Sequence, residues 1–134
     1  MLQPLLVFSD WGILFLRVMF ALVLIAHGVN KLKNFKSTAE WMGNVAKPGK
    51  FWATLVTANE VGGGLLLLAG FFTQIICIIT MLQFLFIIFR VNWKKGLVGG
   101  YELDLMMLAT AFALLTLGPG AYSLDKHFGI TLWW

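Results

Sequence analysis

Four long apolar stretches dominate the pattern of hydrophobic and polar positions along the chain. They span about 11–32, 51–70, 72–93 and 101–117, and short polar segments separate most of them. Because a helix rises about 1.5 Å per residue, each stretch can cross a hydrocarbon core about 30 Å thick. None of them alternates with a two-residue period, and a backbone inside lipid must bond to itself. We therefore expect four transmembrane helices rather than strands.

The connections between the stretches predict how the helices are arranged. The second and third stretches meet at Gly70-Phe71, so they must form an antiparallel hairpin. The first connection carries Ser37-Thr38-Ala39-Glu40, the spacing of a capping box, which predicts a short helix over about 38–45 at the membrane interface. The fold class that follows is an all-α membrane protein with one domain over 1–134. It is a four-transmembrane-helix antiparallel bundle with a short interfacial helix in loop 1.

Composition supports a membrane location and changes how the net charge is interpreted. The chain is 60% hydrophobic and 12% charged, whereas a soluble domain carries about 25% charged residues. A net charge of +4 would favour nucleic-acid binding in a soluble protein, but here the basic residues gather in loops 1 and 3 beside apolar stretches. This distribution indicates topology and contact with anionic lipid, and we expect no nucleic-acid partner. The positive-inside rule places loops 1 and 3 in the cytoplasm and both termini outside.

Two further expectations concern the ends of the stretches. No positively charged region precedes the first apolar stretch, so we expect that the N-terminal segment is not a removable signal peptide. Tryptophans stand near the ends of the stretches, where amphipathic rings favour the headgroup layer. They are Trp11, Trp52, Trp93, Trp133 and Trp134.

Ionisable and amide side chains inside the stretches form two levels. An ionised group near the bilayer centre costs at least about 2.5–3.5 kcal/mol, so it must be paired or line a polar cavity. Counted from loops 1 and 3 at about 1.5 Å per residue, Glu60 and Gln83 lie about 13 to 14 Å deep, with His27 about one turn away. Glu102 and Asp104 lie close to the loop side. The middle level is where we expect a site.

Glu60 has two interpretations that the sequence leaves open. As a functional carboxylate it would accept a proton or bind a ligand, and His27 and Arg17 would share that site, which makes these three the candidate catalytic residues. As a structural carboxylate it would form a salt bridge with Arg17 or a hydrogen bond with His27 that fixes the register of the helices.

Three other groups of residues are candidates for a role. Gly63 and Gly64 follow Glu60 by about one turn. Because they have no side chains, either a neighbouring helix approaches closely there or the space admits a cofactor. Gln83 lies at a similar depth and is the third candidate for cofactor binding. The residues Arg90, Glu102 and Asp104 are expected to form an interfacial charge cluster. No His/Cys pair has metal-ligand spacing and no phosphate or dinucleotide motif is present, so no metal site is predicted.

The chain resembles the DoxX family of bacterial membrane proteins through motifs spread along nearly its whole length. The matching residues are Leu16-Arg17, His27-Gly28, Lys31, Trp41, Asn59-Glu60-Val61-Gly62-Gly63, Leu65–Gly70, Tyr101-Glu102-Leu103 and Gly118-Pro119-Gly120-Ala121-Tyr122-Ser123-Leu124-Asp125. One departure is Gln74, where the family often has arginine. The resemblance implies a four-helix protein of the bacterial inner membrane. Some relatives look like subunits of thiosulfate:quinone oxidoreductase, and others are linked to complexes that handle thiol or oxidative stress.

Three hypotheses about function follow. The leading one is a membrane subunit associated with redox or quinone-linked chemistry, acting with a partner subunit, in which Glu60 accepts a proton or binds a polar head group. A quinone is the cofactor that this chemistry suggests. The second is a non-enzymatic membrane scaffold or assembly factor. The third is a small transporter, which would require a homo-oligomer because four helices leave little room for a pathway.

Overall fold

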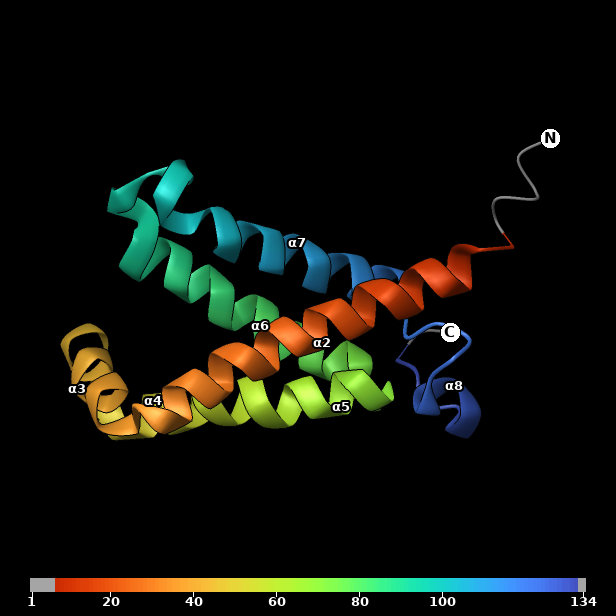
Figure 1. The fold of residues 1–134 in the computed structure, drawn as a ribbon, viewed down its shortest axis with the longest axis horizontal. Coiled ribbons are helices and arrows are strands. Elements are labelled where there is room, and N and C mark those ends of the chain that lie inside the picture. The colour runs from red at the N-terminus through yellow and green to blue at the C-terminus, as the bar shows by residue number, and fades with distance from the viewer. Residues whose placement is uncertain (1–6, 133–134) are drawn as a thin grey trace.

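The computed structural model describes residues 7–132, and within that range the chain is helical and contains no strand (Figure 1). Four of its helices are long and apolar enough to cross a membrane: Ser9–Lys33, Gly49–Ala69, Thr73–Lys95 and Leu97–Leu117. The predicted all-α bundle with four membrane-spanning helices is confirmed. The predicted helix ends differ from these bounds by a few residues because apolar composition does not mark where a helix stops.

Only the first of these spans is a regular α-helix throughout. It is α2 (Ser9–Lys33). The second consists of α4 (Gly49–Ala58), the π-turn η1 (Asn59–Gly63) and α5 (Gly64–Ala69). The third consists of α6 (Thr73–Ile87), the π-turn η2 (Ile88–Asn92) and the 3₁₀ turn η3 (Trp93–Lys95). The fourth begins with the kinked turn η4 (Leu97–Tyr101) and continues as α7 (Glu102–Leu117).

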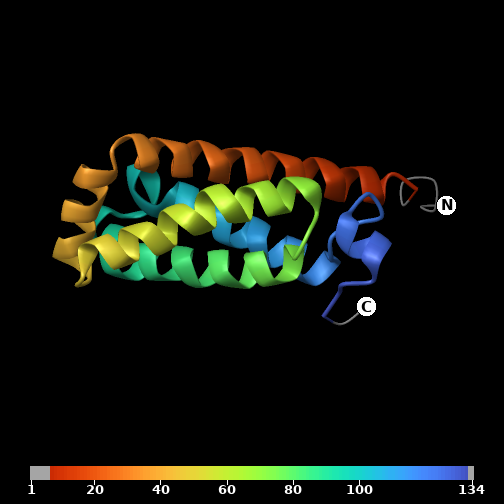
Figure 2. The same cartoon turned by 90° about the horizontal axis from the view of Figure 1, so that it is seen from below.

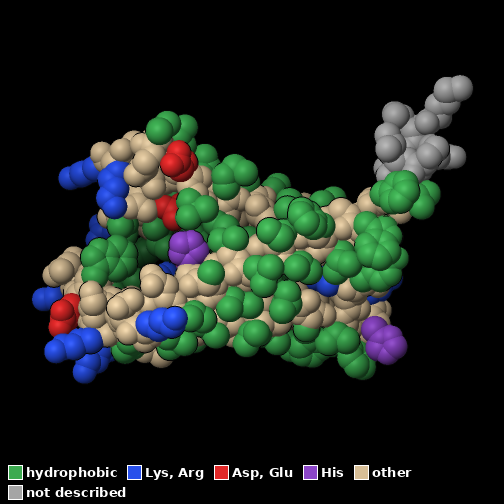
Figure 3. All heavy atoms as spheres, in the orientation of Figure 1, with side chains coloured by type: hydrophobic (Ala, Val, Ile, Leu, Met, Phe, Trp, Pro, Cys, Tyr) green, Lys and Arg blue, Asp and Glu red, His purple; other side chains and the backbone are tan. Residues whose placement is uncertain are grey.

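The spans form an antiparallel bundle with two chemically different ends. Figures 1 and 2 show α3 (Phe35–Val45) and the turn between the third and fourth spans at one end, which we call the loop end. Both chain ends and α8 (Leu124–Phe128) lie at the other, which we call the terminal end. Basic side chains gather at the loop end in Figure 3. The expectation that loops 1 and 3 share a side therefore holds.

The short helix of loop 1 begins earlier than its sequence pattern predicts. It starts at Phe35, with Asn34 as the only residue between it and α2, so Ser37 is not its cap. The Thr38 hydroxyl donates to the Asn34 carbonyl oxygen over 3.0 Å instead. The capping-box prediction was wrong because α2 turns directly into α3, which leaves no unpaired first turn at Ser37.

The core of the bundle is apolar, and large apolar side chains also cover its outside. Buried core residues from all four spans include Phe20, Leu24, Leu67, Cys77, Phe84, Met107 and Leu114. Exposed apolar residues on the outer faces include Phe15, Leu65, Leu82, Met106 and Phe112. Trp11, Trp52 and Trp93 are also exposed, whereas Trp133 and Trp134 lie outside the described residues. Such an outer surface suits lipid as the surrounding solvent.

Candidate functional site

The centre of the site is Glu60, which lies in the π-turn η1 and is 2% exposed. Its Oε1 atom accepts a hydrogen bond from Lys31 Nζ of α2 over 2.5 Å and another from Gln83 Nε2 of α6 over 2.8 Å. Its Oε2 atom is buried and has no hydrogen-bond partner within residues 7–132. The carboxylate is therefore paired on one oxygen and unsatisfied on the other.

A chain of amide groups continues from Glu60 along the face of α6. Gln83 Oε1 accepts from Asn59 Nδ2 over 3.0 Å, and the same nitrogen donates to Thr80 Oγ1 over 3.2 Å. Both hydrogens of the Asn59 amide are thus used, whereas Gln83 keeps one amide hydrogen and Asn59 keeps its carbonyl oxygen. The network leaves the second amide hydrogen of Gln83 for a ligand, whereas the Asn59 carbonyl oxygen is directed toward Gly63.

The local backbone explains why Glu60 and Lys31 can meet. A π-turn inserts about one extra residue into a helix, and such turns are frequent at functional sites. Helix α2 approaches this turn closely at Gly28, where an added Cβ atom would lie 2.9 Å from Glu60 Cβ and 2.9 Å from the Val61 backbone nitrogen. Only a glycine fits such a gap, and its absence of a side chain brings Lys31, about one turn further along α2, within reach of the carboxylate.

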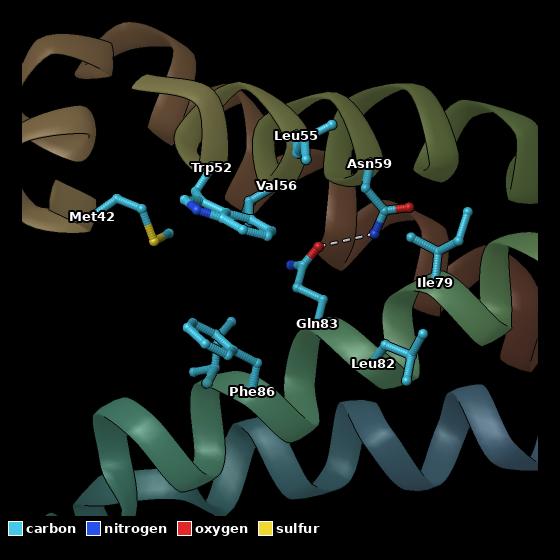
Figure 4. Close-up of a pocket in the computed structure, with 10 residues that line it drawn as sticks. Met42, Trp52, Leu55, Val56, Asn59, Ile79, Leu82, Gln83 and Phe86 are labelled. Atoms are coloured by element: carbon cyan, nitrogen blue, oxygen red, sulfur yellow. Dashed lines mark hydrogen bonds between the residues drawn. The ribbon is translucent and has the colours of Figure 1, made fainter. Parts of the chain in front are cut away.

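One side of this network borders a pocket of about 270 Å³ between α4 and α6, which we call the lateral pocket (Figure 4). Trp52 and Phe86 point from the two helices into this space, near Gln83. The lining is Met42, Trp52, Leu55, Val56, Asn59, Ile79, Leu82, Gln83, Phe86 and Ile87. Trp52, Leu82 and Phe86 are exposed on the outer face of the bundle. The pocket is therefore an apolar recess that faces lipid and carries two amide groups.

The other side of the network borders a second cavity of about 150 Å³, which we call the loop-side hollow. Its polar lining residues are His27, Lys31, Glu60 and Asp104. Figure 3 shows a recess at the loop end with acidic, basic and histidine side chains around it. Met42, Val56 and Ile87 line both cavities, so the Glu60–Gln83 pair stands between them.

Arg17 does not belong to this site. Its guanidinium group lies at the terminal end and donates to the carbonyl oxygens of Pro119 and Tyr122. The predicted salt bridge between Arg17 and Glu60 was wrong, and Lys31 is the partner. Arg17 and Lys31 are 14 residues apart on α2, so they stand about 21 Å apart along its axis, and only the second is level with Glu60.

The C-terminal motif works together with Arg17 to close the terminal end. Asp125 is buried, and its two carboxylate oxygens accept from the backbone nitrogens of Phe72 and Thr73 over 2.7 and 2.8 Å. This carboxylate caps the N-terminus of α6, where unpaired N–H groups favour negative charge. Gln74, the departure from the family pattern, also holds the tail, because its Oε1 atom accepts from the Leu132 backbone nitrogen over 2.6 Å.

The two candidate cofactor-binding glycines lie at packed helix contacts. A Cβ atom at Gly64 would stand 2.6 Å from Ile25 Cγ1 of α2, and one at Gly63 would stand 3.0 Å from Ile76 Cγ2 of α6. Neither residue lines the lateral pocket or the loop-side hollow. Of the two possibilities that the sequence left open, close helix approach is the one that the packing favours. Gln83, the third member of that group, does line the lateral pocket.

The expected charge cluster of Arg90, Glu102 and Asp104 is not formed. The Lys31–Glu60 contact is the only ion pair within residues 7–132. Arg90 is exposed in the π-turn η2, and Glu102 accepts from the Gly99 backbone nitrogen over 3.2 Å. Asp104 accepts from Asn92 Nδ2 over 2.6 Å. The prediction was wrong because π and irregular turns at this end rotate the side chains away from the positions that regular helices would give them.

Residues that the sequence analysis did not place in the site complete it. Lys31 follows His27 by four residues on α2, so both share a helix face, and that spacing was a usable signal. Asn59 is adjacent to Glu60, but nothing in the sequence pairs it with Gln83 and Thr80. Trp52 was expected only at the membrane interface. His27 is exposed and makes no hydrogen bond in the described part of the chain, but it does line the loop-side hollow.

Four apolar spans, a buried ion pair and a lipid-facing pocket define a multi-pass membrane protein with a polar site within the bundle. The profile of the DoxX family matches residues 12–93. The chain belongs to the DoxX family. The profile covers α2 to η2, which includes Lys31, Glu60 and Gln83.

Curated relatives support the same assignment. The chain is 30% identical over 114 residues to the Bacillus subtilis protein named "Putative oxidoreductase CatD", with 85% of this chain and 84% of that protein covered. It is 32% identical over 124 residues to inner membrane protein YqjF of Escherichia coli, covering 88% and 92% of the two chains. Inner membrane protein YphA of the same organism is 27% identical over 132 residues, covering 86% and 89%. No solved structure matches the chain.

Proposed function

We propose that this protein is a bacterial inner-membrane subunit of a redox system and that it binds a quinone head group in the lateral pocket. The observation that carries the proposal is a pair of hydrogen-bonded, half-buried amides, Asn59 and Gln83, that line a lipid-facing apolar pocket. Gln83 is also hydrogen-bonded to Glu60 of the Lys31–Glu60 ion pair. Relatives named as an oxidoreductase and as inner membrane proteins support the redox and membrane parts.

The chemistry of the pocket matches a quinone in three respects. Its mouth is lined by exposed apolar residues, so a ligand with a long apolar tail can enter from the bilayer and leave its tail there. Trp52 and Phe86 offer flat faces on which a ring can stack. The free amide hydrogen of Gln83 can donate to a quinone carbonyl.

Energetics also favours a polar ligand at this place. An amide hydrogen facing an apolar pocket without a partner costs about 1–3 kcal/mol, and a ligand carbonyl would recover that cost. Glu60 fixes the direction of the Gln83 amide by accepting one of its hydrogens, and Lys31 keeps the carboxylate paired. These two residues act as positioning groups for the amides.

Reduction of a quinone to a quinol consumes two electrons and two protons. We propose that a partner oxidoreductase subunit supplies the electrons, while this chain holds the head group and supplies the polar environment. The lateral pocket has lining residues on α4 and α6 at a depth that lipid-soluble quinones reach. The partner would dock on the loop end, where Lys33, Lys36 and Lys95 are exposed.

The proposal is tested by quinone retained during purification. Wild-type protein extracted in mild detergent is expected to carry quinone that chromatography and mass spectrometry detect. Gln83→Leu keeps the volume of the side chain but removes the donor, so quinone retention is expected to fall about tenfold, which corresponds to about 1.4 kcal/mol. Thr110→Val is the matched control, because the Thr110 hydroxyl bonds only to the Met106 carbonyl of its own helix.

The scaffold hypothesis gives a different result in the same experiment. It predicts that the wild type retains no quinone. It also predicts that Glu60→Gln changes only stability or complex assembly. Equal quinone content in the wild type and Gln83→Leu would also contradict binding in the lateral pocket.

A further inference from the structure

Two cavities lie on either side of the Glu60–Gln83 pair: Gln83 lines the lateral pocket and Glu60 lines the loop-side hollow. The proposed quinone site uses only the first. The loop-side hollow brings together His27 and Lys31 of α2, Asp104 of α7 and Glu60 of η1. Its volume is about 150 Å³, and one water needs only about 10–15 Å³ of such space. His27 is exposed and the Lys31 side chain is 22% exposed, so the hollow communicates with the loop end.

The two oxygens of Glu60 are in different situations. Oε1 accepts from both Lys31 Nζ and Gln83 Nε2, at 2.5 and 2.8 Å. Oε2 is buried and unpartnered within the described residues. A buried carboxylate oxygen without a donor is costly, and the cost is removed when it gains a proton or a water. Oε2 is therefore the atom at which an O–H bond would form.

We infer that Glu60 is a protonation site that exchanges protons with the aqueous phase on the loop side, through the loop-side hollow. In the exchange, the Glu60 carboxylate accepts a proton from water in the hollow, and hydroxide or a buffer base remains in the loop-side solution. His27 and Asp104 can each hold a proton, and they line the route between that solution and Glu60.

The charges that face Glu60 come from two helices. Lys31 and His27 face it from α2, and Asp104 faces it from α7. From α6 it meets the neutral amide of Gln83, and from α3 only Trp41 and Met42 line the same cavity. A proton that reaches Glu60 thus enters a site with one cation already bonded to the carboxylate. Protonation would loosen the Lys31 contact and change the partner of the Gln83 amide.

The inference deepens the proposed function and rests on it only for the reaction that consumes the proton. If quinol forms in the lateral pocket with electrons from the partner subunit, charge arriving there is balanced by proton uptake at Glu60. The protonation itself can be tested without any quinone.

Infrared difference spectroscopy on oriented proteoliposomes is the test. Vesicles carry the full chain with its loop end outward, and the inner and outer pH values are varied separately over a range that includes the ordinary titration range of a carboxyl group. The expected result is a protonated-carboxyl band that follows the outer pH and not the inner pH. The band should be lost in Glu60→Gln and shifted in frequency in Glu60→Asp, which keeps a carboxyl group if the first variant fails to fold.

Variants of the hollow test the route. His27→Gln combined with Asp104→Asn keeps both side chains polar but removes both proton carriers, and the response of the band to a pH jump is expected to slow about tenfold or more. Glu102→Gln is the matched control, because Glu102 is exposed at the loop end and does not line the hollow. It should leave the response unchanged.

Two results would overturn the inference. One is the absence of any band that depends on Glu60 across this pH range, and the other is a band that follows the inner pH. Neither result would decide whether quinone is retained, because quinone retention reports binding in the lateral pocket and not protonation of Glu60. Loss of quinone with a normal carboxyl band would instead contradict the proposed function alone.

Discussion

At the scale of single residues, the Lys31–Glu60 pair explains how a carboxylate is kept inside the bundle. Removing the cation would leave Glu60 buried and unpaired, which is the costly way to break a buried ion pair. Because the Lys31 side chain is 22% exposed, removing its charge should destabilise the protein less than removing one charge of a fully buried pair would. The two charges are therefore expected to contribute more to the free energy of unfolding as a pair than either charge would contribute alone.

We predict that Lys31→Met lowers the free energy of unfolding by about 1–3 kcal/mol. The double variant Lys31→Met with Glu60→Gln should recover at least half of that loss, because no buried charge remains. Unfolding measured by denaturing detergent titration checks both values. Lys33→Met, an exposed residue on the same helix, is the control. Additive losses in the double variant would contradict the pairing.

The 2.5 Å contact between Lys31 Nζ and Glu60 Oε1 also predicts a chemical cross-link. A carbodiimide activates the carboxyl group, and attack by the lysine amine forms an amide bond while the reagent takes up one water as its urea. We expect a peptide that joins α2 to η1, detected by mass spectrometry as the sum of two peptides minus water. No such species, with a carbodiimide adduct on Glu60 itself, would show that the two side chains do not meet.

Arg17 has a different role from the one that the sequence suggested, and this too can be measured. Its two bonds to the carbonyl oxygens of Pro119 and Tyr122 hold the tail at the terminal end. Arg17→Met is expected to lower the free energy of unfolding by about 3 kcal/mol, since bonds from a charged donor are lost. Quinone retention per folded molecule should not change. Arg90 is exposed and forms no ion pair within residues 7–132, so Arg90→Met should leave the free energy of unfolding nearly unchanged.

At the scale of helices, glycine positions decide how closely the spans approach. A Cβ atom at Gly28 would lie 2.6 Å from Val61 Cγ2 and 2.9 Å from Glu60 Cβ, whereas one at Gly62 would meet nothing within 4 Å. We predict that Gly28→Ala lowers the free energy of unfolding by about 1–3 kcal/mol, because the added methyl group forces α2 away from η1. Gly62→Ala should be neutral or slightly stabilising, because alanine favours helix over glycine. Equal effects of the two substitutions on the unfolding free energy would contradict this packing.

The sequence predicted the helices well because lipid imposes a simple rule on them. A long apolar stretch must pair its own backbone groups, so the four spans and the hairpin at Gly70 follow directly. The sequence could not predict the π-turns at Asn59–Gly63 and Ile88–Asn92, since nothing in their composition distinguishes them from regular helix. Those turns set the direction of Glu60 and Arg90. The place of Glu60 inside the second span was therefore predictable, but its partner Lys31 was not.

At the scale of the whole molecule, charge separates the two ends of the bundle. The lysines of loops 1 and 3 lie at the loop end together with the hollow, and the termini lie at the other end. The positive-inside rule then predicts a cytoplasmic loop end and termini outside the cell membrane. A C-terminal alkaline phosphatase fusion is expected to be active and a fluorescent-protein fusion dark. The opposite pair of signals would reverse the orientation, and with it the side from which Glu60 takes protons.

The same arrangement gives the molecule two separate entrances to one polar centre. The lateral pocket lies on the apolar outer face, the loop-side hollow lies toward the loop end, and the Glu60–Gln83 pair stands between them. A bundle of four spans can thus bring a lipid-soluble ligand and water-borne protons together without a pathway through its core. This is why we prefer a redox-linked role to a transporter within one chain.

Photoaffinity labelling with an azido-quinone tests most directly whether a quinone head group occupies the pocket between α4 and α6. We expect adducts on the peptides that carry Trp52 to Asn59 and Ile79 to Phe86. Unlabelled quinone should compete for these adducts, and Gln83→Leu should lose most of them. Adducts spread evenly over the outer face of the bundle, with no competition and no effect of Gln83→Leu, would contradict occupancy of this pocket.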